Sequence, residues 1–390
     1  MTKMKTVKPD YYDEFVCIAD RCPYTCCREW KIAVDEDTYS DWRNLATPSE
    51  VMDSDLADAD AAGRVLADYA EGDKGDRAIR LNADKICPLL NDCGLCNVVI
   101  RYGERALSKT CHTFPRESRD YLTRREQDLA IGCPAVLDLL WSRQSYACVA
   151  YDEAGCAPGD IDSDEELERR LFKIRDLFVG IMQDRTYTPE LALKMCFYMG
   201  LEYYKDINAE VTESFIKDLA EGIQGLERDY YDHICEQNEL LLDLAENYRN
   251  KGIYNDVLGG ICEQAEDYEA FARRKKFIKR REAFEGVWTG MEDKIRLLLN
   301  EELFATLVMP EEEMYGVLIK LEWLGIFLAA LKESLFLYWD IHNGLDYDAM
   351  RDITVVLARM TGYSDEDVEE YLENSFEDVI WEFGYMGLII

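Results

Sequence analysis

Apolar residues recur every three or four positions through most of the chain after residue 163, which is the spacing of an amphipathic helix. In the first such segment Ser163 is the expected N-cap, and the apolar positions are Leu167, Leu171, Ile174, Phe178 and Ile181. The same spacing predicts helices over residues 189–199, 213–224, 236–249, 263–283, 291–307, 311–339, 347–361 and 364–379. The pattern therefore predicts an all-α helical domain over residues 160–390.

The first 150 residues have a less regular pattern, in which loops surround the cysteines. Short apolar segments over residues 30–35 and 78–81 predict two strands. Helices are expected to begin at Asp37 and to cover the Ala- and Asp-rich residues 48–69. Residues 152–160 have the Gly- and Asp-rich composition of a linker. The predicted fold is thus mainly α, with a loop-rich cysteine domain of few short strands over residues 1–150, followed by the helical domain.

Acidic residues are concentrated in the predicted helical domain. The chain has 44 Lys and Arg against 79 Asp and Glu, a net charge of −35, of which residues 136–390 carry −29. Such a surface repels phosphate backbones and anionic headgroups, so we expect no nucleic-acid or membrane partner and favour a cationic one. The basic run over residues 273–281 is interpreted as an exposed helix face paired with neighbouring carboxylates.

The apolar segments do not have the form of targeting or membrane signals. Lys320, Glu322, Lys332 and Glu333 interrupt the most apolar stretch, residues 317–339, which favours a buried helix over a membrane span. Residues 1–20 lack the apolar segment of a secretory signal and contain several acidic residues, unlike a transit peptide. We therefore expect a cytoplasmic protein.

Nine of the 14 cysteines lie in the first 135 residues, and the chain has only three histidines. In a reducing cytosol, clustered thiols indicate a metal site or an iron–sulfur cluster rather than disulfides. Thiolates are soft ligands that suit iron–sulfur clusters and zinc, so the site is expected to be all-sulfur. The candidate metal ligands are Cys17, Cys22, Cys26, Cys27, Cys87, Cys96, Cys111 and Cys133.

The spacing of these cysteines leaves several assignments open. One cluster or one structural zinc needs about four ligands, so eight candidates exceed one site. The remainder are neighbouring thiols, a second site or ordinary core residues. Neither the paired CxxC spacing of a zinc ribbon nor the CxxxCxxC triplet of radical enzymes is present. Zinc in place of iron, and redox-active thiols without a metal, remain alternatives.

The cysteine blocks resemble the flagellin lysine-N-methylase family. The resemblance rests on CPYTCC at residues 22–27, CPLL at 87–90 followed by GLC at 94–96, and CHTFPR at 111–116. It covers about the first 135 residues, and cysteine-rich zinc- or iron-chelating domain proteins have similar blocks. The resemblance implies a cytosolic methyltransferase that uses S-adenosylmethionine and an iron–sulfur cluster, expected to be 4Fe–4S, to methylate lysine side chains of flagellin.

Lysine methylation needs a deprotonated amine, so an acidic approach and a desolvating aromatic wall would suit the reaction. Four aromatic residues near the first cysteine block are candidates for such a wall, although packing around the site is the favoured interpretation: Tyr11, Tyr12, Tyr24 and Trp30. Asp13, Glu14 and Asp35 are candidate proton acceptors, and a solvated surface role is favoured for each.

The cofactor site has no recognisable sequence signature. A strand followed by a Gly-rich turn and a helix is absent, so the usual nucleotide-binding fold is not indicated. The sequence assigns no catalytic residue and no S-adenosylmethionine-binding residue. The alternative function is a non-catalytic zinc- or iron-chelating module whose acidic helical domain docks a protein partner.

Overall fold

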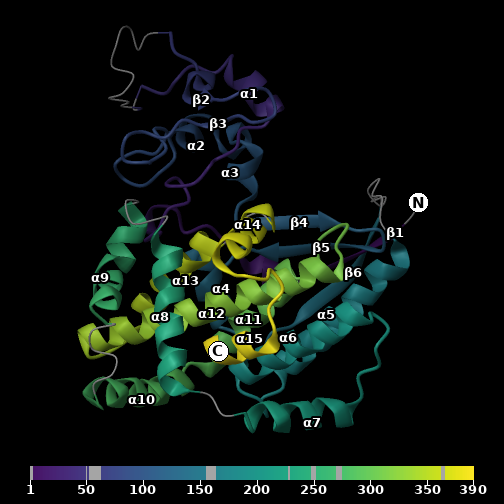
Figure 1. The fold of residues 1–390 in the computed structure, drawn as a ribbon. Helices are drawn as coiled ribbons and strands as arrows, with labels where there is room; N and C mark the ends of the chain where they lie inside the picture. The colour runs from purple at the N-terminus through teal and green to yellow at the C-terminus, as the bar shows by residue number, and fades with distance from the viewer. Residues whose placement is uncertain are drawn as a thin grey trace.

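The structure is a computed structural model that describes residues 3–49, 51, 63–154, 164–226, 229–246, 252–268, 275–361 and 365–390. A large helical body carries a smaller lobe of loops and short helices at one end (Figure 1). We call residues 26–113 the cysteine-rich lobe. The prediction of a mainly α protein with few short strands is confirmed.

The cysteine-rich lobe is built from short elements around a small core of its own. Its elements are α1 (Glu36–Trp42), the 3-10 helix Leu66–Tyr69, β2 (Ala70–Glu71), β3 (Ala78–Ile79), α2 (Asn97–Tyr102), the 3-10 helix Glu104–Ala106 and α3 (Lys109–Thr113). Its core residues are Ile32, Val34, Trp42, Leu66, Ala67, Tyr69, Ile79, Cys87, Leu89 and Val98. Because Cys87 belongs to this core, the lobe packs around part of the cysteine set.

A four-stranded sheet connects the lobe to the helical body. Its strands lie in the order β4 (Arg116–Asp120), β5 (Arg124–Leu129), β1 (Lys3–Pro9) and β6 (Cys148–Ala154). Strand β1 runs parallel to β5 and antiparallel to β6, and β4 pairs antiparallel with β5. The lobe is therefore an insertion between β1 and β4. Val7 and Leu129 belong to the same hydrophobic core as the helices.

The helices of the body follow β5 along the chain, and β6 lies between the first two of them. These helices are α4 (Pro134–Trp141), α5 (Glu165–Gln183), α6 (Pro189–Lys205), α7 (Glu213–Gln224), α8 (Tyr230–Glu246), α9 (Gly252–Tyr268), α10 (Lys275–Thr289), α11 (Glu292–Thr306), α12 (Met314–His342), α13 (Tyr347–Thr361), α14 (Asp365–Ser375) and α15 (Phe383–Ile389). Side-chain caps start several of them. Asp164 accepts hydrogen bonds from the first turn of α5, and Thr188 accepts one from Leu191 N in α6.

Helix α12 is the central helix of the body and contacts α6, α8 and α13. It is long and apolar enough to cross a membrane by length and composition, but 78% of its apolar window is buried inside the protein. Its buried carboxylates have partners: Glu322 accepts a hydrogen bond from Trp381 N, and Glu333 pairs with Arg281 at 2.9 Å. This burial is that of a core helix, as the interrupting charges predict.

The structure confirms some of the predicted helices and contradicts one predicted strand. Residues 213–224 and 347–361 are helical as predicted, while the 263–283 pattern covers parts of α9 and α10, and residues 269–274 lie outside the described part. The strand expected over 30–35 is wrong, since only Ala33 makes an isolated bridge. The helix expected over 48–69 appears only as the 3-10 turn at its end, and most of the stretch is not described.

Three other expectations involve residues outside the described part. Ser163 is one of them, and Asp164 is the observed cap of α5. Residues 155–160 of the expected linker are also outside, and residues 152–154 belong to β6. The basic run is described only from residue 275 onward, within α10. The domain boundary near residue 150 stays a prediction.

Candidate functional site

Five cysteines from the three sequence blocks come together in the cysteine-rich lobe. We call them the lobe thiols: Cys26, Cys27, Cys87, Cys96 and Cys111. The backbone N–H of Cys87 donates to Cys27 O at 2.8 Å, which joins the first two blocks directly. The thiols of Cys87, Cys96 and Cys111 each interact electrostatically with Cys27. Segments about 85 positions apart in the sequence therefore present their sulfurs to one another.

A tight turn returns the chain from Cys87 to Cys96. The side-chain oxygen of Asn91 accepts hydrogen bonds from the N–H groups of residues 93 and 95, both at 2.9 Å. Gly94 occupies the left-handed region, with φ +76°, which a side chain would disfavour. Cys96 then forms an isolated bridge with Leu90 and is the N-cap of α2. The CPLL and GLC motifs thus encode a loop that turns its second cysteine back toward its first.

The third block is held against the lobe by side-chain caps. Ser108, which is 0% exposed, accepts a hydrogen bond from Cys111 N at 3.2 Å and begins α3. Asp35 accepts from Lys109 N at 2.8 Å and also caps α1 through Thr38 N. Although its burial acts in the opposite direction, these hydrogen bonds hold the pKa of Asp35 below its ordinary value. Asp35, a candidate proton acceptor, therefore has a structural role.

The lobe thiols differ in acidity. A hydrogen bond from the neighbouring Cys26 thiol lowers the pKa of Cys27 to about 7, and the same bond and burial raise the pKa of Cys26. Burial raises the pKa of Cys111 to about 11 and also raises those of Cys87 and Cys96. Cys27 is therefore the lobe thiol that most readily becomes a thiolate.

The chemistry of the lobe thiols suits a soft metal or a cluster. Five sulfur donors exceed the four that a cubane cluster or a structural zinc takes. Within the described ranges, no group of three or more His, Cys, Asp or Glu side chains is arranged to hold a metal ion as the side chains stand. Binding would therefore require the thiols to lose protons and their sulfurs to converge. Which of them are ligands stays a prediction.

The other three candidate ligands form a separate group, which we call the outer thiols: Cys17, Cys22 and Cys133. Cys22 interacts electrostatically with Cys17, and Cys133 with Cys22. Cys17 is exposed, whereas Cys133 is buried at the N-cap of α4, and burial raises its pKa to about 11. These interactions link the three outer thiols to one another, and the metal-binding role of the eight candidates stays a prediction.

An arginine from the helical body links the first cysteine block to the segment before Cys133. Arg359 of α13 donates to Tyr24 O at 2.7 Å, to Thr25 O at 3.3 Å and to Gly132 O at 2.9 Å. Its charge acts on both thiol groups, lowering the pKa of Cys26 and of Cys133 against the larger effect of burial. Sequence reasoning missed Arg359, because it lies over 200 positions from both segments and has no motif around it.

A glutamate docks the same block onto helix α9. The Glu29 carboxylate accepts the N–H of Ile253 with both oxygens, at 2.8 and 3.0 Å. An Arg28 nitrogen lies 3.0 Å from the same carboxylate. A carboxylate is stabilised at a helix N-terminus because the first N–H groups of a helix have no partner within it. Glu29 and Arg359 together hold the first block between the lobe and the body.

The aromatic residues considered for a substrate wall have different surroundings. Tyr11 is 0% exposed, and its hydroxyl donates to Glu301 in the core. Tyr24 donates to Asp352 of α13 at 3.4 Å. The ring of Trp30 lies 5.2 Å from that of Phe114, and its indole N–H donates to Cys26 O. Trp30, at 36% exposed, is thus an aromatic surface beside the lobe thiols.

The remaining charged candidates have structural partners. Asp13 pairs with Lys8 at 2.8 Å, and Glu14 pairs with Arg143. Tyr12 is buried, with the Lys8 ammonium 5.2 Å from its ring centroid. No proton acceptor is therefore assigned among Asp13, Glu14 and Asp35.

Comparison with known proteins gives partial matches. Over 142 residues the chain is 29% identical to the flagellar biosynthetic protein FliU of Salmonella muenchen, a stretch that covers 35% of this chain and 76% of that protein. Over 142 residues it is also 29% identical to a lysine-N-methylase of Salmonella choleraesuis and 28% identical to one of Salmonella typhimurium, covering 32% of each. No family model and no solved structure matches.

These matches confirm the resemblance to the flagellin lysine-N-methylase family over about a third of the chain. The chain matches 32% of the length of the lysine-N-methylases.

Proposed function

We propose that this chain is a cytoplasmic protein-lysine N-methyltransferase that acts on flagellin, with S-adenosylmethionine as methyl donor and an iron–sulfur cluster at the lobe thiols. The observation that carries the proposal is the meeting, in one lobe, of cysteines from the three motif blocks that resemble the lysine-N-methylases. The names of the matched proteins supply the reaction and the flagellar substrate.

The ligands of the cluster would come from four of the lobe thiols: Cys27, Cys87, Cys96 and Cys111. Each interacts electrostatically with at least one other of the four. If three of these thiols bound the cluster, one iron would remain open, and this Lewis-acidic iron would supply a site for the amino and carboxylate groups of S-adenosylmethionine. Cys26 stands beside the four as the hydrogen-bond partner of Cys27.

The protein's own contribution to the reaction is to bind the lysine and favour its neutral form. The amine lone pair forms the nitrogen–carbon bond as the methyl–sulfur bond breaks, and the amine's extra proton passes to solvent or to a carboxylate. An ammonium has no lone pair, so the site must lower the lysine pKa from about 10.4. The exposed aromatic surface of Trp30 beside the lobe thiols would desolvate the amine and lower that pKa.

Incubation of the purified protein with methyl-labelled S-adenosylmethionine and flagellin from the same cell tests this function. Label on flagellin lysines is expected from anaerobically purified protein that contains iron and acid-labile sulfide. A protein with its metal content intact that transfers no label would contradict the methylase function. Flagellin with acetylated lysines is the control substrate, and it should remain unlabelled.

An all-sulfur group also suits a structural zinc, which takes four cysteine ligands in a closed site. In that second function the chain is a chelating module that docks a protein partner without catalysis. Colour separates the two functions. Colourless protein with one zinc per chain would support the module, whereas broad visible absorption after anaerobic purification would support the cluster.

A further inference from the structure

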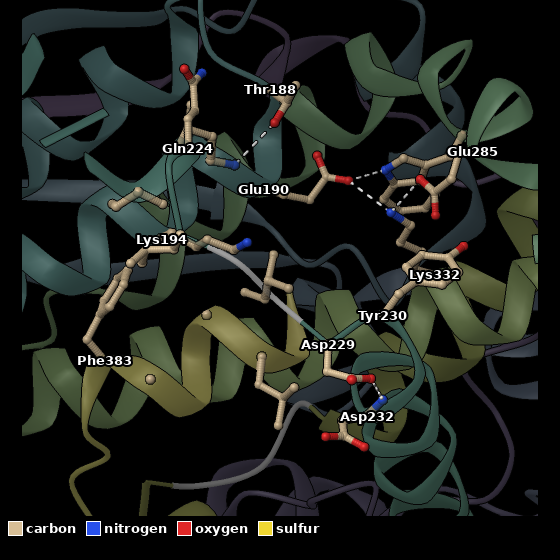
Figure 2. A pocket seen from close by; sticks show the side chains of 18 of the residues that line it. Thr188, Glu190, Lys194, Gln224, Asp229, Tyr230, Asp232, Glu285, Lys332 and Phe383 are labelled. Carbon is tan, nitrogen blue, oxygen red and sulfur yellow. Dashed lines mark hydrogen bonds and ion pairs between the residues drawn. The ribbon is translucent and has the colours of Figure 1, made fainter. Parts of the chain in front are cut away.

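A pocket of about 840 Å³ opens in the helical body, away from all eight candidate metal ligands. Residues of α6, α7, α8, α10, α11, α12 and α15 line it (Figure 2). In Figure 1, α7 and α10 lie at the opposite end of the molecule from the lobe helices α1–α3. A ligand in this pocket would therefore be remote from the thiols.

The wall of the pocket already holds one ammonium group of the protein. Lys332 is only 5% exposed, and its Nζ lies 3.0 Å from Glu285 Oε2 and 3.4 Å from Glu190 Oε1. The same Nζ lies 5.1 Å from the ring centroid of Trp288, whose indole N–H donates to Glu190. Carboxylates and an aromatic face are the groups that stabilise an alkylammonium ion.

Negative charge in the pocket exceeds what its own lysines neutralise. Five carboxylates line it, namely Glu190, Asp229, Asp232, Glu285 and Glu292, against the two cations Lys194 and Lys332. Burial and then the neighbouring Glu190 raise the pKa of Glu292, against the opposing effects of Arg296 and Lys332. An additional cation entering beside Glu292 would relieve that repulsion.

The pocket also offers apolar surface for an alkyl chain. Ile223, Leu226, Leu388 and Ile390 line it with Trp288 and Phe383. Lysine and arginine bury their methylene stems on such surfaces while their charged ends remain paired. The pocket is larger than one side chain needs, which allows neighbouring residues of a peptide to enter with it.

We propose that this pocket docks a basic, lysine-bearing segment of a protein partner. Charge complementarity favours a cationic occupant, because carboxylates outnumber lysines in the pocket and residues 136–390 carry a net charge of −29. The partner's identity as flagellin rests on the proposed function, whereas the pocket's preference for a basic peptide does not. The site holds the substrate at a distance from the lobe thiols, so it is a docking site and not the place of methyl transfer.

The first test compares two variants that remove the same charge from different places. Glu292→Gln changes the pocket, and Glu282→Gln changes an exposed glutamate of α10 outside it. Fluorescence polarisation at low salt measures the Kd of a fluorescein-labelled lysine-rich peptide, with a glutamine-substituted peptide as the negative probe. Glu292→Gln is expected to weaken binding by about fivefold, the equivalent of about 1 kcal/mol, and Glu282→Gln to leave it unchanged.

The second test adds a positive charge at the pocket's edge. Leu226 lines the pocket and is 59% exposed, so Leu226→Lys should repel the peptide without disturbing the core. Ile341→Lys adds the same charge at an exposed position of α12 outside the pocket. Circular dichroism and thermal melts verify that all four variants fold.

Three outcomes would overturn the docking site. The first is that each pocket variant binds the lysine-rich peptide with the same affinity as its matched control. The second is that the lysine-rich and glutamine-substituted peptides bind equally well. The third is that spermidine displaces the peptide but has no effect on flagellin binding. Binding is measured without S-adenosylmethionine, so a failed methylation assay would reject the proposed function and leave the docking site standing. If flagellin is methylated but the pocket variants bind the peptide as tightly as their controls, the docking site alone would be rejected.

Discussion

Cys26 and Cys27 are adjacent in the sequence, yet their thiols have different acidities. Their mutual hydrogen bond favours the thiolate at Cys27, whose pKa falls to about 7, and the neutral thiol at Cys26. A metal or cluster replaces the protons of its thiol ligands, so a thiol that is already acidic gives up its proton at the least cost. Cys27 also has backbone contact with Cys87 of the second block.

Replacing Cys27 is therefore expected to affect metal loading more than replacing an exposed cysteine. Cys27→Ser should reduce the bound iron or zinc to below about half of the wild-type content, because one of the four proposed ligands is lost. Iron, zinc and acid-labile sulfide per chain are measured after anaerobic reconstitution. Cys93→Ser is the matched control, since Cys93 is exposed and outside the lobe thiols. Equal metal content in the two variants would remove Cys27 from the ligand set.

The motif spacing points to the cysteines, but it does not divide them. Cys22 and Cys26 lie in one block of the sequence, yet Cys22 interacts with Cys133 whereas Cys26 interacts with Cys27 and Cys111. That division depends on where α4 places its N-cap, which is a property of the tertiary structure. The contacts of Glu29 and Arg359 could not be predicted from the sequence either, because they join residues more than 100 positions apart.

A buried carboxyl in α11 makes stability depend on pH. Glu301 is 0% exposed and accepts a hydrogen bond from Tyr11; burial, then the nearby Asp128, raise its pKa from 4.5 to about 8. The folded protein therefore favours the protonated carboxyl. Its contribution to stability is complete below about pH 4.5 and is lost as the pH rises through about 8.

Glu301→Gln should remove this dependence, because the amide remains neutral and its oxygen can still accept from Tyr11. Relative to wild type, the variant is expected to gain a few kcal/mol of unfolding free energy at pH 8 to 9, at about 1.4 kcal/mol per pKa unit. Urea unfolding between pH 5 and 9, monitored by circular dichroism, measures the difference. The exposed Glu282→Gln should follow the wild-type curve. Parallel curves for Glu301→Gln and wild type would show that Glu301 does not ionise in this range.

At the scale of elements, helices were far easier to predict than strands. The apolar spacing identifies α7, α11, α13 and most of α12, because apolar residues recur every three or four positions along each of them. The sheet was missed because its strands carry charged residues, such as RESRD in β4 and RREQDL in β5. Glu126 and Asp128 of β5 are each only 1% exposed, so the buried face of this strand carries charged residues in the sequence. Strands β4 and β5 therefore lack the alternation of apolar and polar residues that indicates a strand.

The buried charges of β5 depend on partners from the helices, above all on Arg175 of α5. Arg175 binds both oxygens of Glu126, at 2.6 and 2.7 Å, and both residues are 1% exposed. Arg175→Met should lower the unfolding free energy by about 3 kcal/mol, because it leaves a buried carboxylate with fewer partners. Arg169→Met is the control, since Arg169 pairs with Glu165 on the exposed face of α5. Chemical denaturation that shows equal losses for both variants would contradict this account.

At the scale of the whole molecule, the first cysteine block joins two parts with different properties. The cysteine-rich lobe has a small core and the lobe thiols, whereas the helical body has the large core, the docking pocket and most of the negative charge. Glu29 binds the block to α9, and Arg359 binds it to α13. Removing either contact by a substitution in the body should therefore change the reactivity of the thiols, although no residue of the lobe is replaced.

Arg359 allows a direct test of this connection. Arg359→Met removes three hydrogen bonds to the segments that carry Cys26 and Cys133, so both thiols should react faster with iodoacetamide, by about tenfold if roughly 1.4 kcal/mol of local stability is lost. Mass spectrometry of timed alkylation gives the rate at each cysteine. Arg359→Lys should restore part of the protection, because lysine keeps the charge but reaches fewer carbonyls.

The exposed Arg185→Met is the matched control for a lost arginine, since its pair with Asp293 lies on the surface. The pattern of reactivity separates coupling from general destabilisation. If Arg359 acts as a link, Cys26 and Cys133 gain reactivity while the fully buried Cys196 of α6 remains protected. Faster alkylation of Cys196 to the same degree would mean that the variant loosens the whole fold, and the link between body and thiols would then have no support.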